Sequence, residues 1–77
     1  MISNKPKKRS LLLNGHKTSV SLEEPFWIYF CELASKQNVS CSALASHIDF
    51  NRSPEVGLAT SIRIFCLAEA RKKEGTV

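Results

Sequence analysis

The sequence contains few of the residues that stabilise a small protein through disulfides or metal ions, or that carry out catalysis. Its 77 residues include three cysteines, none in a C-x-x-C pair, and two histidines without metal-ligand spacing toward them. There are three glycines but no glycine-rich phosphate loop, and no nucleophile is set beside a base. We therefore expect reduced cysteines that pack as small hydrophobes, no metal, no cofactor, no small-molecule substrate and no enzymatic activity.

Long apolar runs are also missing. The basic start is followed by three leucines before Asn14-Gly15, which is too short for the apolar part of a signal peptide, and nothing reaches the length of a membrane span. We predict a cytoplasmic protein that meets no membrane. A chain this short forms one domain at most, and such a small core often needs a partner subunit.

Acidic residues are absent from the first twenty positions, which hold five lysines and arginines. The other 57 positions hold six basic and seven acidic residues, so the net charge of +4 belongs to one end. This asymmetry is typical of a basic arm that binds a polyanion. The alternative is a solvated tail that only aids solubility. We predict a disordered basic arm over residues 1–9, whose candidate phosphate contacts are Lys5, Lys7, Lys8 and Arg9.

Residues 10–22 have the pattern of extended chain. Asn14-Gly15 is a strong turn signal, so residues 11–13 form either a hairpin strand or a free arm. After the turn the side chains alternate in character, and alternate residues of a strand share a face. One face carries Thr18, Val20 and Leu22; the other carries Lys17, Ser19 and Ser21.

Three helices are expected after the ribbon. The first starts near residues 21–24, either with a Ser21–Glu24 capping box or with Glu24 as the cap before Pro25, and Asn38 ends it in a left-handed conformation. The second opens at Ser40, a good N-cap, and ends before a loop over residues 50–54. The third begins between residues 53 and 57 and runs to about residue 73.

The third helix is apolar around most of its circumference, so it needs burial on most sides. The ribbon also has at least one edge without a partner strand. One solution meets both needs: the same strand of a second copy pairs antiparallel across a two-fold axis and brings two third helices together. The expected dimer interface is Thr18, Val20, Leu22, Leu58, Ile62 and Phe65. The polar residues Lys17, Ser19 and Ser21 would then lie on a two-stranded ribbon, which fits the major groove of DNA.

The sequence resembles a bacterial ribbon-helix-helix subfamily over about residues 9–70. The resemblance rests on Arg9-Ser10 and on G-H-K-T-S-V-S-L-E at 15–23 followed by Phe26-Trp27, close to the pattern G-H-[RK]-T-S-[VI]-x-L-E-x-x-F-W. Downstream, S-A-L at 42–44, I-D at 48–49 and S-I-R-x-F at 61–65 agree with it. Asn38 stands where glycine is common, Pro25 is shifted by one position, and Gly57 replaces a better-capping residue.

The resemblance implies a mainly helical fold with a short N-terminal ribbon, a ribbon-helix-helix with an additional helix that forms an intertwined homodimer of the MetJ/Arc type. The domain would cover residues 10–73 and leave 74–77 as a tail. The implied function is sequence-specific binding of double-stranded DNA for transcriptional regulation, through base contacts by Lys17, Ser19 and Ser21. The family also anchors phosphate at a helix N-terminus. Two helix starts compete for that role here: the one with Ser40 and Ser42, which we favour, and the one at residues 57–61.

Two alternatives stay open. One is a protein-interaction module, such as an antitoxin or an assembly adaptor. The other is a ribbon-helix-helix oligomer that does not bind DNA. Whether dimers pair into tetramers is also open.

Overall fold

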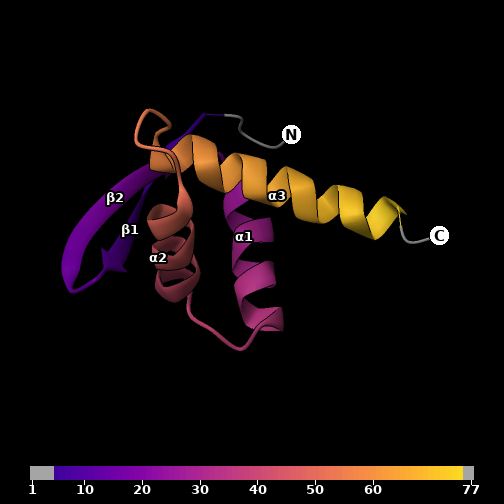
Figure 1. Cartoon of the computed structure of the whole chain (residues 1–77), viewed down its shortest axis with the longest axis horizontal. Coiled ribbons are helices and arrows are strands. Elements are labelled where there is room, and N and C mark those ends of the chain that lie inside the picture. The colour runs from indigo at the N-terminus through magenta and orange to yellow at the C-terminus, as the bar shows by residue number, and fades with distance from the viewer. Residues whose placement is uncertain (1–4, 76–77) are drawn as a thin grey trace.

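A tight hairpin and three helices make up the structure, a computed structural model that describes residues 5–75 (Figure 1). The hairpin comes first and the helices follow, which confirms the expected mainly helical fold with a short N-terminal ribbon. α3 is the longest element, and its C-terminal part extends beyond the others (Figure 1). The elements are β1 (Lys7–Leu13), β2 (His16–Leu22), α1 (Glu24–Lys36), α2 (Cys41–Asn51) and α3 (Leu58–Gly75).

The hairpin turn is formed by Asn14 and Gly15, which have φ angles of 51° and 82°. Two consecutive positive φ angles define the type I′ turn, whose twist matches that of the flanking strands. The strands are antiparallel, and their register runs from the pair Leu13–His16 at the turn to Lys7–Leu22 at the open end. Residues 11–13 therefore belong to a hairpin strand, and the free-arm alternative is wrong.

The basic arm is shorter than expected, because β1 begins at Lys7. Residues 7–9, which we expected to be disordered, pair with the far end of β2, and composition alone does not reveal this pairing. Positions 1–4 of the expected arm lie outside the described residues. At the other end α3 continues through Gly75, so the expected tail is also shorter, and its last two positions lie outside the described residues.

The N-terminus of α1 follows neither capping scheme that the sequence suggested. Its N-cap is Glu23, which makes no side-chain capping bond, and Pro25 occupies the first turn, where a missing N–H costs nothing. The chain leaves α1 through Asn38, whose φ of 58° confirms the expected left-handed residue. This reversal places α2 directly after α1.

The N-terminus of α2 is capped as expected: the Ser40 hydroxyl accepts a hydrogen bond from the Ala43 N–H at 2.9 Å. The helix continues to Asn51, so Phe50 and Asn51, expected in a loop, are its last turn. The side-chain amide of Asn51 donates to the His47 carbonyl at 2.8 Å, one turn earlier in the helix. The loop before α3 is correspondingly short.

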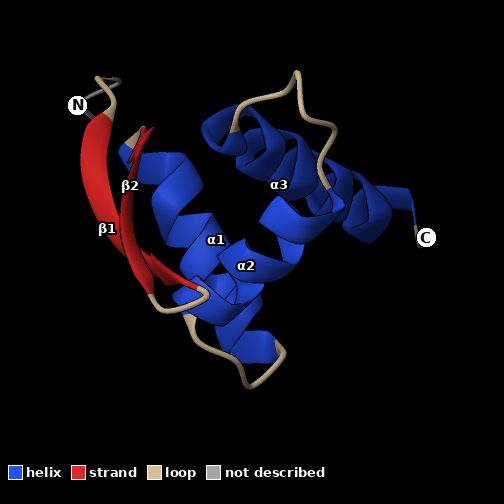
Figure 2. Cartoon of the chain, turned by 60° about the vertical axis from the view of Figure 1, so that its left-hand side comes forward, coloured by secondary structure: helices blue, strands red, loops and turns tan. Residues whose placement is uncertain are grey.

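The hairpin lies against one side of the helices (Figure 2). Its inward side chains, Leu11 and Leu13 from β1 and Val20 and Leu22 from β2, are buried. Burial of this face against the helices stabilises a two-stranded hairpin that would be marginal alone. The helices contribute the rest of the core: Phe30, Leu33, Ala34, Leu44, Ala45, Ile48, Ile62 and Cys66.

Candidate nucleic-acid interface

The face of the hairpin that points away from the helices is polar and exposed, and we call it the outer face. β2 contributes Lys17, Ser19 and Ser21 to it, all exposed. These are the three residues that the sequence predicted to contact bases, and the structure brings them to one side. Cross-strand pairing sets them opposite residues of β1. The full outer face is Lys8, Ser10, Leu12, Lys17, Ser19 and Ser21.

Ser10 and Leu12 are members of the outer face that sequence reasoning missed. Leu12 is 53% exposed although it is a large apolar residue, and it stands opposite Lys17 in the register. An exposed apolar side chain among hydroxyl and ammonium groups can contact a thymine methyl group. The signal for it was the alternation of residues 8, 10 and 12, which becomes visible once β1 is known to start at Lys7.

The N-terminus of α2 lies beside the outer face. The backbone N–H of Leu12 donates to the Ser42 hydroxyl at 2.9 Å, although 30 residues separate the two in the sequence. Ser42 also lines a shallow hollow with Ser10, Leu12, Lys17 and Ser19. Ser40 and Ser42 both use their oxygens as acceptors within the chain, so each keeps its hydroxyl proton for a further acceptor.

Arg9 is not available for phosphate, because it is committed inside the chain. Its Nη2 lies 2.6 Å from the Glu24 carboxylate and 3.3 Å from the Leu22 carbonyl, and its guanidinium stacks over Trp27 at 5.5 Å from the ring centre. Its side chain is 13% exposed. The expected phosphate contact at Arg9 is therefore corrected to a bond between the hairpin and α1. Charge counting missed this because the partners are far apart in sequence.

Arg63 makes the matching contact from α3. Its guanidinium bonds both oxygens of Glu23, at 2.9 and 3.2 Å, and its Nη2 donates to the Ser21 carbonyl at 3.3 Å. Glu23 and Arg63 are 40 positions apart, so no short sequence pattern predicts the pair. Together Arg9 and Arg63 neutralise both carboxylates at the open end of the hairpin. Lys7, Lys8 and Lys17 make no ion pair with the described residues, so the hairpin keeps a positive excess.

These ion pairs predict a loss of stability in acid. Hydrogen bonds from Arg63 and Arg9 hold the pKa values of Glu23 and Glu24 below 4.5. A carboxylate whose pKa is lower in the folded state contributes stability above its unfolded pKa and loses it as pH falls through the folded value. We expect the melting temperature to fall as pH drops below about 4.5.

Thermal melts from pH 7 to pH 2.5 measure this effect. The double variant Glu23→Gln/Glu24→Gln should lose less stability on acidification than the wild type. The control is Glu32→Gln, which changes an exposed carboxylate of α1 that makes no ion pair in the described chain. This variant should lose as much stability on acidification as the wild type does. Parallel curves for the wild type and the double variant would contradict the assignment.

The residues predicted to form the dimer interface differ in how much surface they expose. Leu22 and Ile62 are fully buried within the chain and Val20 is 6% exposed, so this fold leaves them no surface for a partner. Thr18, Leu58 and Phe65 are half-buried. The apolar surface that α3 does expose is made by Ile64 and Leu67, at 59% and 58%.

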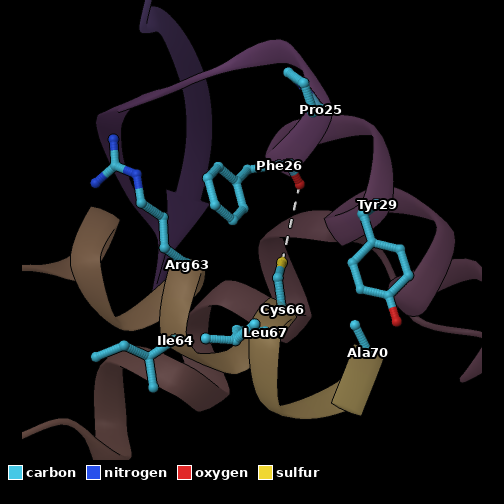
Figure 3. A pocket seen from close by; sticks show the side chains of 8 residues that line it. All are labelled: Pro25, Phe26, Tyr29, Arg63, Ile64, Cys66, Leu67 and Ala70. Carbon is cyan, nitrogen blue, oxygen red and sulfur yellow. Dashed lines mark hydrogen bonds between the residues drawn. The ribbon is translucent and has the colours of Figure 1, made fainter. Parts of the chain in front are cut away.

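Ile64 and Leu67 border an apolar groove of about 370 Å³ between α1 and α3 (Figure 3). Its α1 wall is made by Pro25, Phe26 and Tyr29. Arg63 stands at its rim, and the same side chain bonds the Ser21 carbonyl of β2. The groove and the end of β2 are therefore one continuous surface.

The edge of β2 that faces away from β1 has no partner strand, because the sheet of the described chain has two strands. Backbone N–H and C=O groups alternate in direction along a strand. The Arg63 bond to the Ser21 carbonyl shows that the backbone N–H and C=O groups of Ser21 are directed to this edge. Those of Ser19 and Lys17, two and four residues earlier, are directed to it as well. On β1 the equivalent edge is partly covered, since Leu12 bonds Ser42.

The hairpin followed by helices and the positive outer face define a class of protein. The chain belongs to the ribbon-helix-helix domain family, whose model matches residues 6–70. Domains of this family typically bind DNA as transcription regulators and are generally not enzymes. The narrower subfamily signature stays a prediction.

A solved structure supports the same fold. An uncharacterized protein from Bordetella pertussis Tohama I superposes with a TM-score of 0.72 at 26% sequence identity. The match covers 97% of this chain and 64% of that one, so the chain spans less than two thirds of that protein's length. No curated protein matches the chain significantly. Within the described residues, no helix has both the length and the hydropathy needed to cross a membrane.

Proposed function

We propose that the chain is a homodimeric, sequence-specific DNA-binding protein that regulates transcription. The observation that carries the proposal is the outer face: three exposed polar side chains of β2 stand in a row beside a strand edge without a partner in the described chain. A ribbon built from two such strands fits the major groove, where hydroxyl and ammonium groups reach base edges.

The dimer forms along the free edge of β2. A second copy of β2 pairs antiparallel with it, which satisfies the outward N–H and C=O groups of Lys17 and Ser19. Continuity of this edge with the apolar groove through Arg63 lets the same partner cover Ile64 and Leu67. The partner thereby removes the largest exposed apolar side chains of α3 from water.

The spacing between strands indicates which residues of the dimer would contact bases and which would contact phosphates. The dimer sheet has the order β1–β2–β2–β1 and, at about 4.8 Å between strands, is about 14 Å across. The major groove is about 12 Å wide, so it admits the two central strands while the outer ones lie near its walls. Lys17, Ser19 and Ser21 of both copies face the bases, and Lys8 of β1 faces phosphate.

The N-terminus of α2 lies farther out on the same side, because Ser42 bonds the outer edge of β1. Its free N–H groups and positive dipole end suit a phosphate of the groove wall, with hydroxyl donors from Ser40 and Ser42. Lys5 and Lys7, at the open end of the hairpin, add charge on the flank. Arg9 takes no part in this set.

Salt dependence tests the DNA-binding proposal. If each half of the dimer neutralises two phosphates, the logarithm of the binding constant falls with the logarithm of salt concentration at a slope of roughly −0.9 per phosphate. Affinity for duplex DNA should therefore drop about 100-fold between 50 and 200 mM salt. Fluorescence anisotropy with labelled genomic fragments measures this. Failure to retain any duplex at 50 mM salt would contradict the proposal and favour a protein-interaction module.

A further inference from the structure

Two of the three cysteines meet in the structure. Cys31, in the second half of α1, and Cys41, the first residue of α2, have their sulfurs 2.8 Å apart, with the Cys41 thiol donating to Cys31. A disulfide needs about 2.05 Å, so bond formation requires the sulfurs to approach by less than about 1 Å. The reversal at Asn38 brings the two helices to this position.

Both thiols are half-buried and can be reached from solvent. Cys66 differs: it is 2% exposed in the core, and burial raises the pKa of its thiol to about 11. Burial and the contact with Cys41 raise the pKa of the Cys31 thiol to about 12, so Cys31 is protonated at neutral pH. Cys31 and Cys41 thus differ from Cys66 in two respects: solvent reaches their thiols, and their sulfurs lie close to each other.

We propose that Cys31 and Cys41 form a reversible intrachain disulfide that clamps α1 to the N-terminus of α2. The oxidant is a peroxide. It oxidises the Cys41 thiol to a sulfenic acid with release of one water, and the Cys31 sulfur then displaces the hydroxyl group as a second water. Overall, two thiols and one hydrogen peroxide give one disulfide and two waters. A dithiol reductant reverses the bond by exchange.

The bond links residues ten positions apart, across a segment that already reverses direction, so it acts mainly by restricting the unfolded chain. We expect oxidation to raise the melting temperature by about 10 °C. The clamp also fixes the residue next to Ser42, which bonds the outer edge of β1. The inference does not depend on DNA binding.

Peptide mapping of the full chain tests the proposal. Reduced protein is treated with a small excess of hydrogen peroxide, and its intact mass should fall by two hydrogen atoms. Trypsin separates the cysteines, since it cuts after Lys17, Lys36 and Arg52, and again after Arg63 and Arg71. Without reduction, peptides 18–36 and 37–52 should appear joined, whereas peptide 64–71 should remain open to alkylation.

Matched variants complete the experiment. Cys66→Ala should oxidise like the wild type, while Cys31→Ala and Cys41→Ala should each lose the two-hydrogen mass change and the peroxide-dependent rise in melting temperature. Circular dichroism of the reduced variants confirms that each is folded. Covalent dimers on non-reducing gels, a disulfide that includes Cys66, or a gain of oxygen atoms in place of the two-hydrogen loss at peroxide doses that alkylation shows to have consumed both thiols would overturn the inference.

Discussion

Replacement of Lys17 and Ser19 together by alanine is expected to weaken binding to a selected DNA site by at least about 1000-fold, because it removes four base contacts from the dimer and each contributes about 1–3 kcal/mol. Both side chains are exposed on the outer face, and neither contributes to the core. The variant should therefore melt within a few degrees of the wild type. Its residual affinity should be the same for selected and random duplexes, since the phosphate contacts remain.

The matched control is Lys36→Ala/Ser35→Ala, which makes the same two changes on exposed residues in the last turn of α1. This control should keep its preference for the selected site. Gel shifts of both variants on selected and scrambled duplexes give the comparison. Equal preference in the Lys17/Ser19 variant and the wild type would contradict base recognition by the outer face.

The second large effect concerns the dimer. Ser19→Pro should raise the dimer dissociation constant by about 100-fold or more, because proline removes an N–H from the proposed pairing edge and places ring atoms there in both copies. The Ser19 N–H points away from β1, so the bonds within the hairpin are kept. Sedimentation equilibrium should show monomers for the variant at concentrations at which the wild type is dimeric.

Ser10→Pro is the control for this substitution. Ser10 is the register partner of Ser19, and its N–H likewise points away from the hairpin, but toward the edge that faces α2. This variant should remain dimeric. Monomerisation by both prolines would indicate general damage to the hairpin, and no monomerisation by Ser19→Pro would mean that the dimer does not pair along β2.

Local chemistry made much of the fold predictable. The Asn14-Gly15 turn, the left-handed Asn38 and the Ser40 cap each depend on one or two residues whose backbone preferences are strong, and all three occur as expected. The alternation of β2 likewise predicted the correct inward and outward faces. These features needed no knowledge of distant partners.

The errors lie where a distant partner decides the outcome. Residues 7–9 are basic and look disordered, yet β2 supplies a pairing strand, and Arg9 finds Glu24 and Trp27. Ile62 has the pattern of an interface residue but is buried by its own chain. Arg63 and the Cys31–Cys41 contact were missed for the same reason. The three expected base contacts, in contrast, share one exposed face of β2.

Selection of bound fragments from a random duplex library tests the central claim most directly. The account predicts enrichment of a site with approximate two-fold symmetry that binds two copies of the chain, with the enrichment lost in the Lys17→Ala/Ser19→Ala variant. Retention of DNA without enrichment of any sequence, or a single copy bound to an asymmetric site, would contradict it.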